Sequence, residues 1–157
     1  MKKADNKTVY LSKKGMKELK KSIVRLERDH QEALLQLRDL DKTDGHDERL
    51  ARIEKLAAIE IIESNLADKR MTLAASKLLP RKRDMLKVAI GSVVDLLDTS
   101  GRLVRYTIVE SIEANPSDGR ISAESPLGQS LLGRQLQDVV EWTSGIRTNR
   151  VQLIGIA

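Results

Sequence analysis

The sequence contains no cysteine and very few aromatic residues, and each absence excludes classes of protein. Without cysteine the chain forms no disulfides, no zinc–thiolate sites and no Cys nucleophile. Aromatic residues make up 2% of the chain (Tyr10, Tyr106 and Trp142, with no Phe), too few to bind single-stranded nucleic acid by base stacking. The two histidines, His30 and His46, are well separated in the sequence, which disfavours a His-rich metal site.

Long hydrophobic runs are also missing. No apolar stretch approaches the roughly 20 residues of a membrane span. Four of the first seven residues are charged and no apolar segment follows them, unlike a secretory signal. A chain of 157 residues that is 40% hydrophobic and 32% charged can still bury a core in one domain or two small ones. We therefore expect a cytoplasmic protein with no membrane partner.

The charge is unevenly distributed along the chain, whose net charge is +5. Residues 1–38 carry 11 basic against 5 acidic residues, whereas residues 39–48 carry one Lys against five acids. A second basic segment covers residues 80–87, and the remainder is slightly acidic. Basic segments favour a polyanion through counterion release, whereas an acidic patch favours a cation.

The first half has the pattern of a helical hairpin. Apolar residues recur at alternating spacings of three and four from Met16 to Leu40, which predicts a helix over 13–41 with Ser12 as its N-cap. A second series predicts a helix over 47–78. Folding the chain at about residue 44 places Ile23 opposite Leu66 and predicts an antiparallel coiled coil. The expected seam of the second helix contains Leu50, Ile53, Leu56, Ile59, Ile62, Leu66 and Leu73.

The segment between the two helices, residues 39–48, is the most acidic of the chain. We expect Gly45 to supply a positive φ for the turn, and Asp44 or Asp47 to cap the second helix. Five acids in ten residues exceed the needs of capping, so a capping role and a functional role both remain open. His30 falls at a seam position, and we expect it to pack there or to extend outward rather than to bind a ligand.

The second half has the pattern of a small β-rich domain. Residues 80–88 are expected to form a linker. Strand patterns separated by Gly-containing turns follow, and Ser125-Pro126 begins a short helix that ends at Gly133. The pattern predicts an antiparallel sheet of about five strands with one short helix, which is an α+β module.

In four features together, the sequence resembles the Gre family of bacterial transcript-cleavage factors. The N-terminal Leu11-Ser12-Lys-Lys-Gly15-Met-Lys-Glu-Leu19 is similar to the family's L-T-x-x-G-x-x-x-L opening. The acidic-tipped coiled-coil hairpin is the second feature, and the third is Ile121-Ser-Ala-Glu-Ser-Pro126-Leu-Gly-Gln-Ser-Leu131-Leu-Gly133-Arg, which resembles I-S-x-x-S-P-L-G-x-x-L-L-G-K/R. The fourth is Asp138-Val-Val with a terminal strand that ends in Ile-Gly-Ile. The resemblance covers nearly the whole chain, and its third motif is the most specific.

The resemblance implies both a fold and a function. The α+β fold would contain an N-terminal antiparallel two-helix coiled-coil hairpin at residues 1–79, a linker at 80–88 and an FKBP-like antiparallel β domain with one short helix at 89–157. The β domain would bind bacterial RNA polymerase while the hairpin enters its secondary channel. The factor would then stimulate the polymerase's own cleavage of nascent, backtracked RNA and rescue arrested complexes. It would not itself be an enzyme.

The resemblance also carries site residues. The family's functional Asp and Glu, in G-D-L-x-E-N-A, align with Asp41 and Asp44; this tip departs from the pattern, with Leu40 for Gly, Asp44 for Glu and Gly45-His46 for Asn-Ala. Both acids would help hold a Mg²⁺ ion of the polymerase active site, in the complex only, and the free protein would need no cofactor. The expected RNA-proximal basic residues are Lys13, Lys14, Lys17, Lys20, Lys21, Arg25 and Arg28, each of which could equally be a solvated surface residue. The expected polymerase-binding residues are Ser125, Pro126, Leu127, Gly128, Leu131, Gly133 and Arg134.

Three alternatives stay open. A Gre homologue could occupy the same channel as an inhibitor, which the altered, acid-rich tip would favour. An FKBP-like module could be a peptidyl-prolyl isomerase, although Tyr106 and Trp142 offer little aromatic lining for its pocket. A structural coiled coil would explain the hairpin but not the tip or the 125–134 motif. We expect a monomer.

Overall fold

The computed structural model describes residues 7–42, 45–80 and 85–157, and it divides into two compact units. One unit contains Met16–Ser76, and the other contains Thr8–Gly15 together with Lys77–Ala157. We refer to them as the hairpin unit and the C-terminal unit. The C-terminal unit is thus assembled from two separate stretches of the chain.

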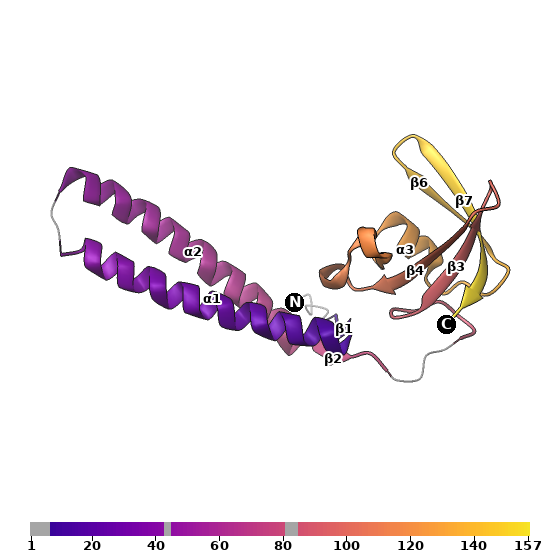
Figure 1. Ribbon diagram of the computed structural model, residues 1–157, viewed down its shortest axis with the longest axis horizontal. Helices are drawn as coiled ribbons and strands as arrows, with labels where there is room; N and C mark the ends of the chain where they lie inside the picture. Colours follow the sequence, from indigo (N-terminus) through magenta and orange to yellow (C-terminus); the bar gives the residue numbers. More distant parts are fainter. Residues whose placement is uncertain (1–6, 43–44, 81–84) are drawn as a thin grey trace, which may run out of the picture. The chain divides into compact units, whose positions relative to one another are not determined.

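The hairpin unit is built from two long helices, α1 (Lys13–Leu40) and α2 (His46–Ala74), as Figure 1 shows. Ser12 caps α1, since its Oγ accepts a hydrogen bond from the Gly15 backbone N–H at 2.9 Å. The seam buries a short series of apolar side chains: Leu19, Ile23, Ala33, Ile59 and Leu66. Polar pairs join the helices beside this seam, including His30 Nε2 with Glu63 Oε1 at 2.9 Å and Arg70 with Glu27 at 2.7 Å. The predicted antiparallel helical hairpin is confirmed.

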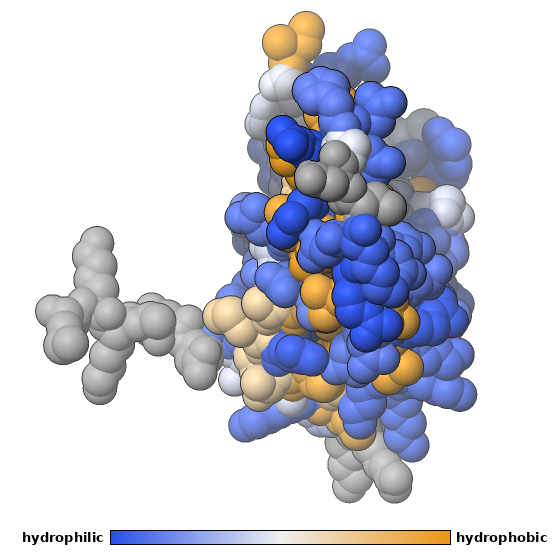
Figure 2. All heavy atoms as spheres, turned by 90° about the vertical axis from the view of Figure 1, so that its left-hand side faces the viewer, coloured by the Kyte–Doolittle hydropathy of each residue, from blue (hydrophilic) through white to orange (hydrophobic). Residues whose placement is uncertain are grey.

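The prediction that Leu50, Ile53 and Leu56 belong to the buried seam near the tip is wrong. Leu50, Ile53 and Leu56 are 61%, 64% and 46% exposed. They precede Ile59 in steps of three residues, and each such step moves a side chain about 60° around a helix of 3.6 residues per turn, so Leu50 lies about half a turn away from Ile59. Lys55 is half-buried instead, and its Nζ donates to Gln36 Oε1 on α1 at 2.6 Å. Figure 2, which views the molecule from the side of the tip, shows the resulting mixture of hydrophobic and hydrophilic surface.

The second helix also ends earlier than predicted. α2 stops at Ala74, and Ser76–Leu78 form a short strand, β2, that pairs with β1 (Val9–Leu11). The Leu79 N–H donates to the Leu11 carbonyl at 2.9 Å, which extends this pairing. Strand pairing with a distant segment overrides the local helical preference, and the sequence pattern of residues 75–78 contains no signal for it.

The C-terminal unit contains a five-stranded sheet in the order β5-β4-β3-β7-β6. The strands are β3 (Val93–Asp98), β4 (Leu103–Val109), β5 (Arg120–Ser122), β6 (Val139–Ser144) and β7 (Arg147–Ile156). Neighbouring strands are antiparallel as predicted, except that β4 and β5 are parallel. The exception arises because β5 follows β4 through two 3₁₀ turns, η1 (Ser111–Glu113) and η2 (Pro116–Asp118), rather than through a hairpin.

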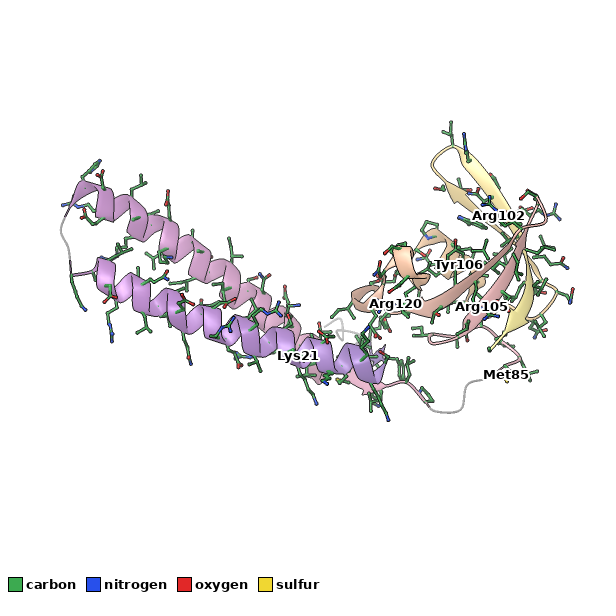
Figure 3. The ribbon with its side chains drawn as sticks, viewed as in Figure 1. Lys21, Met85, Arg102, Arg105, Tyr106 and Arg120 are labelled. Carbon is green, nitrogen blue, oxygen red and sulfur yellow. The ribbon has the colours of Figure 1, made fainter. Side chains whose placement is uncertain are left out.

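The core of this unit lies on one face of the sheet, where the helix α3 (Pro126–Leu131) packs. Its fully buried side chains are Val94, Leu96, Ile108, Leu131, Val140 and Leu153. Alternation along β4 places Tyr106 against this core, whereas its neighbour Arg105 forms a 2.7 Å ion pair with Asp95 (Figure 3). None of the described helices is both long enough and apolar enough to cross a bilayer.

Candidate functional site

The tip of the hairpin presents exposed carboxylates. Asp39 lies in the last turn of α1, and Asp41 follows its end, with the Asp41 N–H still donating to the Leu37 carbonyl at 3.1 Å. Thr43 and Asp44 lie outside the described residues, so the structure places only one member of the predicted acid pair.

The turn differs from its prediction at the start of α2. Gly45 is the N-cap residue and has φ −85°, so the predicted positive φ is wrong. Asp47 is not the cap: it lies with Glu48 in the first helical turn, where acids are stabilised by the helix dipole. Part of the acidity of the tip is therefore explained by the needs of α2.

Two of the described acids of the tip, Asp39 and Asp41, are paired with basic side chains. Asp41 forms a 3.0 Å ion pair with Arg52 of α2, and Asp39 accepts a 3.0 Å hydrogen bond from the Lys42 ammonium. The Lys42 contact holds the pKa of the Asp39 carboxyl below its usual value, so this acid is ionised at neutral pH. Residues 7–42, 45–80 and 85–157 bring together no group of three His, Asp or Glu side chains that could hold a metal. Asp41 can offer a hard oxygen ligand to an ion, but the remaining ligands must come from elsewhere.

The predicted basic residues occupy one face of α1. At about 100° per residue, the seven positions fall within roughly 140° of the helix circumference, on the side opposite the buried seam. All of them are exposed: Lys13, Lys14, Lys17, Lys20, Lys21, Arg25 and Arg28. Figure 3 labels Lys21 as one example. Within the part of the chain that the structure describes, the ion pairs at this face are weak, such as Lys21 with Glu18 at 3.6 Å, so the face retains most of its positive charge.

The motif at residues 125–134 forms α3 and its exit. Ser125 caps the helix by accepting from the Gly128 N–H at 3.0 Å, and Pro126 occupies the first turn. Gly128 is buried against the backbone of residues 122–123, where an added Cβ would overlap the Ser122 carbonyl oxygen. Gly133 adopts the predicted left-handed conformation, with φ 77°.

This arrangement separates the residues of the motif that build the fold from those that face outward. Leu131 is fully buried, and Leu127 packs against the same core. Pro126, Gly133 and Arg134 are exposed. Of the residues of this segment that were predicted to bind the polymerase, these three are therefore the most accessible to a partner.

Two buried carboxylates were not predicted from the sequence. Glu110 and Glu113, 5% and 9% exposed, accept hydrogen bonds from the N-terminal segment at Tyr10 and Ser12. Single Glu residues among mixed apolar and polar neighbours carry no sequence signal for burial.

A groove among the described residues of the C-terminal unit does not resemble an isomerase pocket. A shallow groove of about 180 Å³ on the C-terminal unit is lined by polar and aliphatic residues such as Leu97, Val139 and Gln152, with no aromatic side chain. Small-molecule pockets are usually larger and lined by aromatic groups. Tyr106 and Trp142 instead pack against the core.

Comparison with known proteins shows which family this chain resembles. The family model described as "Transcription elongation factor, GreA/GreB, C-term" matches residues 83–156. The transcription elongation factor GreA of Clostridioides difficile (strain 630) is 31% identical over 145 residues, which cover 87% of this chain and 88% of that protein. GreA of Thermoanaerobacter pseudethanolicus is 34% identical over 144 residues, covering 86% and 88%. The solved structure of GreA factor homolog 1 (Gfh1) of Thermus thermophilus covers 96% of this chain and 99% of its own, at 25% identity and a TM-score of 0.45.

The chain belongs to the GreA/GreB family of transcription elongation factors.

Proposed function

We propose that this protein binds bacterial RNA polymerase through its C-terminal unit, inserts the hairpin into the secondary channel and stimulates the polymerase's cleavage of backtracked RNA. The observation that carries this proposal is the exposed Asp41 carboxylate at the end of α1, a helix of 28 residues. Such a helix is about 42 Å long and can carry a carboxylate deep into a narrow channel. The protein acts as a monomer in this scheme, and the catalytic activity belongs to the polymerase.

The tip acts by supplying oxygen ligands. Asp41, together with Asp44, would complete the coordination of a Mg²⁺ ion that the polymerase and the RNA phosphate also hold. When bound there, Mg²⁺ supplies an activated water and stabilises the leaving oxygen. Asp41 must first leave its ion pair with Arg52. Breaking this pair costs little free energy, because the Asp41 and Arg52 side chains are 42% and 54% exposed and such surface pairs contribute about 0–1 kcal/mol.

The basic face of α1 supports a role for the stem. Seven cationic side chains on one side of a helix attract a polyanion that lies along it, and the extruded 3′ segment of backtracked RNA is such a partner. Salt should weaken this contribution more than it weakens the docking of the C-terminal unit.

The tip is tested by cleavage of RNA in a stalled elongation complex. Asp41→Asn with Asp44→Asn keeps the side-chain shape and removes two charges, and Asp39→Asn with Asp47→Asn is the matched control that removes the same charge from the same tip. We expect the first pair to abolish stimulation while the control retains most of it, and both to compete normally for the channel. Wild-type stimulation by the first pair would overturn the proposal, as would a wild-type protein that only suppresses cleavage.

Docking is tested separately on the full chain. Arg134→Glu reverses an exposed charge beside α3, and Arg147→Glu makes the same change at an exposed position of β7. We expect only Arg134→Glu to weaken polymerase binding, with no change in melting temperature for either variant. Equal affinities would exclude the 125–134 segment as the docking surface.

A further inference from the structure

A group of polar contacts joins the beginning of α1 to the segment around Glu110 and Glu113. The Ser12 backbone N–H donates to Glu113 Oε2 at 2.9 Å, and the Ser12 hydroxyl donates to the other oxygen of the same carboxylate. The Tyr10 N–H reaches Glu110 at 3.4 Å. About a hundred residues of chain separate the two sides, yet all of these residues belong to the C-terminal unit.

Gly15 makes this contact possible. A Cβ at residue 15 would overlap the Glu113 carboxyl group, which lies directly against the glycine. Gly15 also donates its N–H to the capping hydroxyl of Ser12. Because this backbone is helical, any residue could adopt it, but a larger residue at position 15 would displace the Glu113 carboxyl group from its place against the helix.

Glu113 also supplies the charge that the helix itself lacks. The first turn of α1 contains no acidic residue and begins with Lys13 and Lys14. A carboxylate at a helix N-terminus satisfies free N–H groups and meets the positive end of the dipole. Because a buried carboxylate is costly unless its hydrogen bonds are made, Glu113 holds the Ser12 segment in place rather than merely lying near it.

We propose that Glu113 is a positioning residue, which fixes the first turn of α1 within the C-terminal unit so that docking of that unit sets the location of the tip. This inference rests on the proposed function. A looseness of only 10° at the base of a helix about 42 Å long would displace its far end by about 7 Å. Metal ligation and proton transfer tolerate errors of well below that size.

The experiment separates binding from activity in the full-length protein. Glu113→Gln retains the shape but loses the charge, and Gly15→Ala displaces the carboxylate from the opposite side. Glu141→Gln, an exposed acid of the same unit, is the matched control. Polymerase affinity is measured by competition, and the maximal cleavage rate is measured at saturating factor.

We expect both variants to bind polymerase within about twofold of wild type and to lose at least tenfold of the maximal stimulation, while Glu141→Gln loses neither. A purely structural defect would lower the affinity and the maximum together, and that result overturns a positioning role. Full stimulation by Glu113→Gln at wild-type affinity overturns it as well, while leaving the proposed function intact.

Amide hydrogen exchange makes the test independent of the polymerase. In Glu113→Gln the Ser12 amide should exchange at least tenfold faster than in wild type, whereas amides in the middle of α1 should not change. This outcome supports anchoring even if the wild-type protein has no effect on cleavage, a result that would overturn the proposed function alone. Unchanged exchange at Ser12 overturns the anchor itself.

Discussion

Replacement of Gly128 by alanine tests why the most specific motif of the chain contains glycine. Gly128 lies in α3, buried against the backbone that precedes Ser125. An added methyl group would overlap the Ser122 carbonyl oxygen and would lie 3.0 Å from the Ala123 Cα. Backbone atoms cannot turn aside as a flexible side chain can, so α3 must shift or the sheet edge must bend.

The size of the effect follows from two opposing contributions. Overpacking a close-packed core costs about 1–3 kcal/mol. Alanine recovers about 0.5–1 kcal/mol relative to glycine in a helix. The net loss is therefore about 0–2.5 kcal/mol, and its midpoint of just over 1 kcal/mol corresponds to a decrease in melting temperature of roughly 5–10 °C for a domain of this size.

The chain contains its own reporter for this measurement. Trp142 is the only tryptophan and packs against the core of the C-terminal unit, so its fluorescence follows the unfolding of that unit. Far-UV circular dichroism is dominated by α1 and α2 and follows the hairpin. Gln129→Ala, at an exposed position of the same helix, is the control and should change the transition by less than about 0.5 kcal/mol. A Gly128→Ala protein with the wild-type fluorescence transition would refute the steric reasoning.

Three further outcomes are expected. Ile23→Asp buries a charge in the seam and should lower the stability of the hairpin by several kcal/mol in thermal unfolding, whereas Val24→Asp, at a neighbouring position that is 65% exposed, should have little effect. The Arg105 hydrogen bond lowers the pKa of Asp95, so this pair stabilises the folded state above the unfolded pKa of about 3.9, and the contribution disappears as the pH falls through the lower folded value. Acid unfolding followed by fluorescence should accordingly be less steep for Asp95→Asn below about pH 4 than for wild type. Ile146, fully exposed in the β6–β7 turn, should tolerate serine with no change in melting temperature beyond about 1 °C.

Local patterns predicted the elements of this fold well where local physics decides them. The Ser125–Gly133 cap-to-cap signal and the turn glycines locate α3 and the strand ends, because capping and positive φ are properties of a few adjacent residues. The seam near the tip is predicted wrongly because the prediction rests on which residues are apolar. Burial there is decided by the angular position of each residue around the helix. Leu50 and Ile53 are apolar but lie on the outer side of α2.

Contacts between distant segments could not be predicted in the same way. The β1–β2 pair and the Glu113 contact with Ser12 depend on the approach of residues more than sixty positions apart, and no single residue in either segment indicates it. For the candidate site, composition located the acidic tip, but it could not indicate that Arg52 would pair with Asp41. That pairing depends on the rotation of α2 against α1, which is the same quantity that the seam prediction lacked.

Because the C-terminal unit is built from two stretches of chain, the hairpin is an insertion between them. β1 and β2 are paired strands, and the two long helices are the loop between them. In evolutionary terms such a loop can lengthen or shorten in matched steps without disturbing its host: one extra heptad in each helix would extend the reach by about 10 Å and leave every contact of Ser12 and Glu113 unchanged. During synthesis the first strand emerges long before its partners, so the host can complete its fold only after the whole insertion has been made.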